Sequence, residues 1–275
     1  MIKAKDILKP AEELQALFHK GIQDKRIPRK AQEIQTFDGY VEGLKHKILV
    51  SVHCCNVLNS FDWNPGGILD SRLPVPRRSV LSPMPAEPTQ QEEDAEEEVE
   101  YFFKTEAASG VFVLDFVRRC ISDCVNATDT LARAMNVCFQ IGIAPEDVNI
   151  KSVYDSISNP RFDFLQPLRK KLERHAWQQK RGANRERIIL RPSWLSDLRT
   201  IRGVFQHGSI HDAFSQTDSV RWNFSPEQET LFEPRHFQSN DFKNFEVPQL
   251  CDRAIVLLGE LMTDVTEGVA KCIFQ

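Results

Sequence analysis

Residues 105–141 read TEAASGVFVLDFVRRCISDCVNATDTLARAMNVCFQI and carry the strongest periodic pattern in the sequence. Mostly apolar residues recur in alternating steps of three and four, at Leu114, Val117, Ile121, Cys124, Thr128, Leu131, Met135 and Cys138. Such steps place side chains along one face of an α-helix. The pattern therefore predicts one long helix that buries a single seam, as an element of a helical bundle does. Gly142 and Pro145 are typical signals for its end.

Other segments with helical spacing complete the predicted fold. These helices are expected over residues 10–24, 37–59, 161–181, 193–207 and 248–274. The first is expected to start at Pro10, and the third to break or kink at Pro167. Residues 220–238 alternate and contain turn residues, which predicts a β-hairpin or an irregular excursion. The expected fold is all-α, a single domain over residues 1–275 built as a bundle of five to six helices with a small β-like excursion before the last helix.

An unusual insertion separates two of the expected helices. Residues 64–100 contain six prolines, and residues 92–100 contain seven acidic side chains in nine positions. Such a composition cannot bury enough apolar surface to offset the entropy lost on ordering. We expect a disordered, flexible insertion or an extended strap, whose acidic part either is simply solvated or lies across a basic surface as a mimic of nucleic acid.

The composition favours a cytoplasmic protein without a membrane anchor, a metal or a cofactor. The longest apolar runs fall well short of the roughly 20 residues that span a bilayer, and the N-terminus has no pattern of a secretory signal. The seven cysteines have apolar neighbours and are expected to be reduced thiols in the core. Cys120 and Cys124 lack a second ligand pair of suitable spacing, and Gly208 separates His207 from His211 and Asp212.

Basic charge is concentrated in one part of the chain. The net charge is -4, but residues 161–202 hold twelve basic and four acidic residues, so this segment carries +8 and the remainder -12. A phosphate-rich partner requires such an excess, because each neutralised phosphate releases counterions. The same excess is also typical of solvated helix faces. If the partner is RNA, the candidate RNA-binding residues are Arg199, Arg191, Arg187 and Lys171.

The predicted helix over residues 193–207 carries the most suggestive polar pair. Ser193 is placed to cap it, and Asp197 lies near the positive end of the helix dipole. Trp194, Leu198, Ile201 and Phe205 form its apolar stripe. Arg202 flanks this stripe, whereas His207 lies roughly 140° further round the helix. One helix cannot easily aim both side chains at one atom, but two copies related by a two-fold axis can.

The sequence Arg202-Gly-Val-Phe-Gln-His207, late in a helical bundle and just before Gly208, resembles the R-x4–6-H motif of the HEPN superfamily. The resemblance covers residues 105–274. It implies a homodimeric helical bundle that acts as a metal-independent endoribonuclease, in a toxin–antitoxin or phage-defence setting with an antitoxin or regulatory protein as partner. By this resemblance Arg202 would hold the scissile phosphate, and His207 would transfer protons during attack by the RNA 2′-hydroxyl.

One position departs from the motif, and two other functions compete with catalysis. Family members commonly have a polar residue, most often asparagine, after the arginine, where this chain has Gly203. Glycine cannot orient His207, although it can allow a partner helix or an RNA backbone to approach closely. The alternatives are a non-catalytic helical dimer that binds RNA or protein, and a structural subunit that docks through residues 92–100. No G-x-S-x-G, P-loop or G-x-G-x-x-G signature supports another enzyme class.

Overall fold

The computed structural model describes residues 2–60, 106–181, 187–207, 231–232 and 245–274. Four long helices dominate these residues: α1 (Ala4–Gln23), α2 (Ala31–Ser60), α5 (Glu106–Phe139) and α10 (Val247–Phe274). Three shorter helices are α6 (Ile150–Ser156), α7 (Gln166–Leu172) and α8 (Trp194–His207), with the 3-10 helix η1 (Pro160–Leu165) before α7. The chain is therefore an all-α bundle, as predicted. The helix α7 is shorter than the one predicted over residues 161–181, and α6 lies where no helix was predicted.

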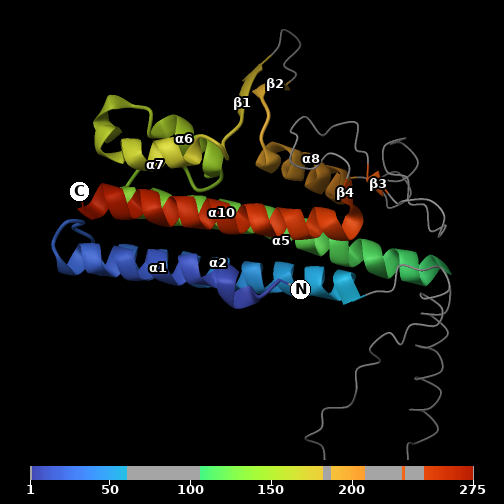
Figure 1. Ribbon diagram of the computed structural model, residues 1–275. Coiled ribbons are helices and arrows are strands. Elements are labelled where there is room, and N and C mark those ends of the chain that lie inside the picture. The colour runs from blue at the N-terminus through green and yellow to red at the C-terminus, as the bar shows by residue number, and fades with distance from the viewer. Residues whose placement is uncertain (1, 61–105, 182–186, 208–230, 233–244, 275) are drawn as a thin grey trace, which may run out of the picture.

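The core lies between the four long helices, which run side by side (Figure 1). The predicted seam of α5 is buried wherever its side chains are described, from Val117 to Cys138. Phe18 of α1 stacks on Phe37 of α2 with ring centroids 3.9 Å apart, which fixes the corner between these helices. Within the described part of the chain, no helix is long and apolar enough to cross a membrane.

A second layer of α6, α7 and α8 covers one side of α10 and α5, and a hairpin between α7 and α8 projects away from the bundle (Figure 1). The hairpin pairs β1 (Gln178–Arg181) with β2 (Arg187–Arg191) in antiparallel register. A second antiparallel pair joins β3 (Leu231–Phe232) to β4 (Phe245–Glu246), so a β excursion does precede the last helix. The predicted insertion over residues 64–100, with its acidic part over residues 92–100, lies outside the described residues.

Three of the predicted helices have wrong boundaries. The helix predicted over residues 37–59 begins earlier, at Ala31. The first helix begins at Ala4 instead of Pro10, because Ile7 and Leu8 pack against the core and hold the turn before the proline. The helix predicted over residues 161–181 is divided at Pro167, which lies in the first turn of α7, and it ends at Leu172. Residues 178–181 then form β1, because the pairing with Arg187–Arg191 overrides their local helical tendency.

Candidate functional site

The motif helix α8 begins with the cap that the sequence predicts. The backbone N–H of Ser196 donates to Ser193 Oγ at 3.3 Å, and the backbone N–H of Ser193 donates to Ser196 Oγ at 3.0 Å. This reciprocal pair satisfies two backbone donors that a helix N-terminus leaves free. Trp194, Leu195, Leu198 and Ile201 are buried, so the first two turns of α8 are firmly seated.

Two polar contacts align α8 with α5. Arg199 forms an ion pair with Asp129, and Arg202 Nη1 donates to Asn126 Oδ1 at 3.2 Å. A step of three residues forward on α8 thus corresponds to a step of three residues back on α5, so the two helices run in opposite directions here. Arg199 also lies over the ring of Trp177, with 5.4 Å between its guanidinium carbon and the ring centroid. These contacts leave Arg202 half-buried with an orientation set from the neighbouring helix.

The rest of the motif lies at the C-terminal end of α8. A Cβ added at Gly203 would have no atom within 4 Å, so this face of α8 is open in the described part of the chain. The helix ends at His207, whose side chain lies outside the described part, as does that of Arg187 on β2. The structure therefore brings Arg202 together with Asn126 and leaves the contacts of His207 undefined.

The other predicted RNA-binding residues have partners within the chain. Lys171 is ion-paired with Asp264 and Glu267 of α10. Arg191 Nη2 donates to the backbone oxygens of Glu173 at 2.9 Å and Ala176 at 3.2 Å. The charge of +8 counted along residues 161–202 is thus partly offset in space by carboxylates of α10 and α5.

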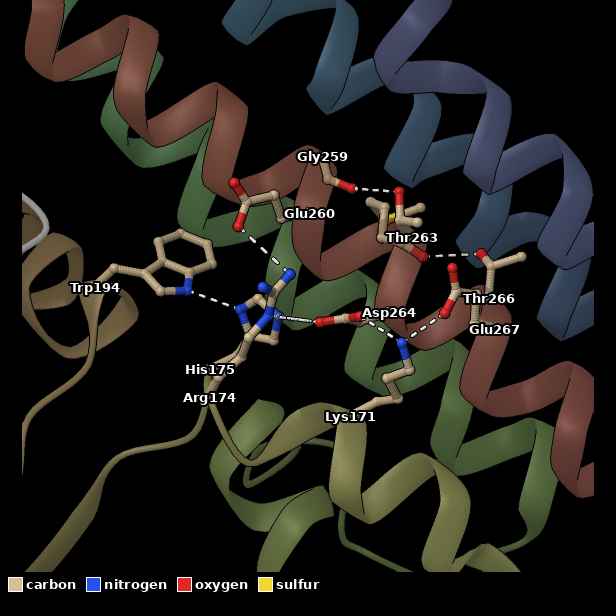
Figure 2. Close-up of polar contacts among 11 residues, drawn as sticks. Lys171, Arg174, His175, Trp194, Gly259, Glu260, Thr263, Asp264, Thr266 and Glu267 are labelled. Atoms are coloured by element: carbon tan, nitrogen blue, oxygen red, sulfur yellow. Dashed lines mark hydrogen bonds and ion pairs between the residues drawn. The ribbon is translucent and has the colours of Figure 1, made fainter.

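A polar network that the sequence analysis missed lies where α7, α8 and α10 meet (Figure 2). Trp194 Nε1 donates to His175 Nδ1 at 2.9 Å, and His175 Nε2 lies 3.1 Å from Asp264 Oδ2. An indole N–H can only donate, so Nδ1 must accept and the neutral imidazole carries its proton on Nε2. That proton points to Asp264. The imidazole therefore connects the start of α8 to the middle of α10, and these two hydrogen bonds allow only the tautomer with its proton on Nε2.

Two cations complete the network around Asp264. Arg174 Nε lies 2.6 Å from Asp264 Oδ2, and Lys171 Nζ lies 3.1 Å from Asp264 Oδ1. Arg174 Nε also lies 3.1 Å from His175 Nε2, but that nitrogen is a donor, so the carboxylate is the true acceptor. Burial opposes ionisation of Asp264, yet the hydrogen bonds from His175 and Lys171 and the charge of Arg174 together lower its pKa. Asp264 is thus an ionised hub.

This network has no free group for acid–base catalysis. His175 is 1% exposed, and both of its ring nitrogens are engaged. An open hollow of about 540 Å³ lies beside it, lined by Lys170, Lys171, Glu173, Arg174, Ala176, Arg191, Pro192 and Asp264. The basic side chains Lys171, Arg174 and Arg191 on this wall each have an acidic partner. The network's role is therefore to seat α8 on α10.

The buried cysteines form no metal site in the described part of the chain, where no group of three or more potential ligands is arranged to hold an ion. Cys120 contacts the thiols of Cys124, Cys251 and Cys55, and these contacts together with burial raise its pKa well above the usual value. It is a neutral thiol packed between α2, α5 and α10.

Acidification is expected to destabilise the protein through His175. Burial is the main cause that lowers the pKa of His175, and the charge of Arg174 lowers it further. Asp264 and Glu260 act in the opposite direction, but the pKa is lowered overall. An unfolded histidine takes up its proton near about pH 6.5, where the folded one is still neutral. Below that pH the unfolded chain holds more protons, so the free energy of unfolding falls, by up to about 1.4 kcal/mol per pH unit for one proton.

Urea denaturation from pH 7.5 to 5.0, at intervals of half a unit, measures this effect. The matched control is His175→Gln, whose side-chain oxygen can accept from Trp194 while its amide donates to Asp264. This variant is expected to lose the decline that the wild type shows below about pH 6.5. If the free energy of unfolding depends on pH in the same way for the wild type and for His175→Gln, His175 is not the cause of the decline. Asp264 contributes separately and at lower pH, because a lowered carboxyl pKa removes stability only as pH falls through about 4 and below.

Comparison with known proteins finds no match for this chain among protein families, curated proteins or solved structures.

Proposed function

We propose that the protein is a metal-independent endoribonuclease of the HEPN type, with Arg202 and His207 as its catalytic residues. The observation that carries the proposal is the hydrogen bond from Arg202 to Asn126 on a helix that is capped and buried at its start. An arginine held in this way is pre-organised to bind an anion, because its side chain loses little further conformational entropy on binding. A surface arginine in a long flexible conformation would lack this property.

The proposed reaction uses the RNA 2′-hydroxyl as nucleophile. Its oxygen attacks the adjacent phosphorus, the bond from phosphorus to the 5′-oxygen breaks, and the products are a 2′,3′-cyclic phosphate and a 5′-hydroxyl. The guanidinium of Arg202 stabilises the charge that develops on the phosphoryl oxygens. The 2′-hydroxyl loses one proton and the departing 5′-oxygen gains one. The imidazole of His207 carries out this transfer as general acid or base, a role for which histidine is chemically suited.

A homodimer supplies the geometry that one helix lacks. Arg202 and His207 are five residues apart, which places them roughly 140° apart around α8. A two-fold axis next to the ends of two α8 helices brings the arginine of one protomer opposite the histidine of its partner. The open face at Gly203 is compatible with such a close approach. RNA and a second copy of the chain are thus the proposed partners.

A cleavage assay tests the proposal. The purified protein is incubated with single-stranded and structured RNAs in excess EDTA, and the product ends are analysed. Cleavage is expected to survive chelation and to leave 2′,3′-cyclic phosphates, and it is expected to be absent from Arg202→Ala and His207→Ala. Lys9→Ala, a change at an exposed position on α1, serves as a control. EDTA-sensitive cleavage, or products with a 3′-hydroxyl, would overturn the proposed mechanism.

Gly203 favours a second candidate, a HEPN-like dimer that binds RNA or protein without cutting. Glycine has no side-chain amide that could orient His207, and it lowers helix stability by about 1 kcal/mol relative to alanine. This candidate predicts RNA binding with intact dimers and no cleavage under any of the conditions above. Asn126 argues for the enzyme instead, because it supplies from α5 an amide next to Arg202.

A further inference from the structure

We propose that Arg133, Arg199 and Arg202 form a phosphate-binding site for RNA on α5 and α8, with Asp129 as their shared counter-ion. The substrate class rests on the proposed function, but the site extends beyond the two motif residues. Its new member is Arg133, which the R-x4–6-H pattern does not include.

The arrangement follows from the alignment of the two helices. Asn126, Asp129 and Arg133 succeed one another in steps of three and four and therefore lie on one face of α5. Arg199 contacts Asp129 and Arg202 contacts Asn126 on that face. Burial has the largest effect on Asp129 and raises its pKa overall, while the charges of Arg199, Arg202 and Arg133 act in the opposite direction. All three guanidinium groups therefore lie within electrostatic reach of this carboxyl group.

The three arginines share Asp129 as a counter-ion. Only Arg199 is in contact with it, whereas Arg202 and Arg133 act on it through their charge. Asp123, which hydrogen-bonds Asn126, lies within the influence of Lys47 and Arg119. The three guanidinium groups and Asp129 together carry an excess of two positive charges. The side chains of Arg199 and Asp129 are each only 21% exposed, so water screens this excess weakly. Burial and the charge of Arg202 lower the pKa of Arg199 against the opposing effect of Asp129.

The excess positive charge indicates what kind of ligand would balance it. The buried Nε atoms of Arg133, Arg199 and Arg202 have no hydrogen-bond partner among the described residues, as is also the case for Arg29 and Arg169, so the charge of the three arginines and not these donors points to an anion. A partly buried cation without full compensation is costly unless an anion pairs with it. Guanidinium groups match the oxygens of a phosphate in geometry as well as in charge. The site spans residues 126–133 of α5, about 10 Å along the helix axis, which suits a strand with successive phosphates better than an isolated ion.

The test measures binding separately from cleavage. The probe is a fluorescent single-stranded oligoribonucleotide with 2′-O-methyl groups throughout, which lacks the attacking hydroxyl and cannot be cut. Its Kd is measured over a series of salt concentrations for the wild type, Arg133→Gln, Arg133→Lys and Lys9→Ala. Arg133→Gln keeps most of the side-chain stem, so packing is preserved, and circular dichroism confirms that each variant is folded. Lys9 lies on α1, across the bundle from α8 (Figure 1), and its replacement removes the same charge elsewhere.

Arg133→Gln is expected to weaken binding about five- to tenfold and to reduce the slope of log K against log salt by about 0.7. Arg133→Lys is expected to keep the slope, and Lys9→Ala to leave both quantities unchanged. If Arg133→Gln behaves like Lys9→Ala, or if the wild type does not bind the probe, the proposed site is overturned.

Cleavage of unmodified RNA separates this inference from the proposed function. If Arg133→Gln loses binding but the wild type never cuts unmodified RNA, the ribonuclease proposal fails and the phosphate site stands. If the wild type cuts RNA while Arg133→Gln binds the probe normally, the phosphate site fails alone.

Discussion

A mixture of the Arg202→Ala and His207→Ala proteins is expected to recover about a quarter of wild-type cleavage, if each site takes one residue from each protomer. Each variant alone is expected to lose cleavage by about 10²–10⁴-fold, because each lacks a charge-stabilising or proton-transferring group. The recovery is the more informative result, since simple misfolding of either variant would prevent it.

The expected fraction follows from how dimers form. After random exchange of subunits, about half of the dimers contain one protomer of each kind. In such a dimer one site combines the intact Arg202 of one protomer with the intact His207 of its partner, and the second site has neither. Half of the dimers are mixed, and half of the sites in each mixed dimer are intact, so about a quarter of all sites are active.

Suitable controls separate this outcome from partial activity of the variants. The double variant Arg202→Ala/His207→Ala mixed with Arg202→Ala offers no intact site and is expected to remain inactive. Size-exclusion chromatography of all proteins establishes that they dimerise. If the two single variants stay inactive after exchange, whereas the wild type cuts, both residues act within one protomer and the two-fold arrangement of the site is wrong.

Long helices were predictable because their signal is local. The alternation of three- and four-residue steps in residues 105–141 predicts α5, and the same steps predict α2 and α10. The serine cap of α8 also follows from adjacent residues. In each of these cases the information lies within one or two turns of the chain.

Features that depend on distant contacts were not predictable. The strand β1 exists because it pairs with β2, and the turn before Pro10 exists because the core lies beneath it. At the site, Arg202 meets Asn126 across 76 residues, and His175 meets Asp264 across 89. No spacing within the sequence relates these residues. One partial signal was present: the basic and aromatic residues of RHAW, 174–177, lie together near the end of the helix predicted over residues 161–181.

Replacing Asp264 with alanine is expected to lower the free energy of unfolding by about 3 kcal/mol, at the lower end of the cost of breaking a buried charge pair. The carboxylate accepts from Lys171 at 3.1 Å, from Arg174 at 2.6 Å and from His175 Nε2 at 3.1 Å. The side chain of Asp264 is only 11% exposed, so in the alanine variant water can replace the lost carboxylate as a partner of these groups only in part. Urea denaturation at pH 7.5 measures the change.

Glu267→Ala provides the matched comparison, because Glu267 pairs with the same Lys171 and comes from the same helix. Its side chain is 51% exposed, and an exposed ion pair contributes only about 0–1 kcal/mol. Asp264→Asn is expected to fall between the two, since an amide oxygen still accepts the proton of His175 Nε2 but carries no charge for Lys171 and Arg174. Equal losses for Asp264→Ala and Glu267→Ala would contradict a buried hub. Losses that decrease from Asp264→Ala through Asp264→Asn to Glu267→Ala would instead show that Asp264 holds α8 in place. The carboxylate stabilises the tautomer of His175 that carries its proton on Nε2, and only this tautomer accepts the hydrogen bond from Trp194 of α8.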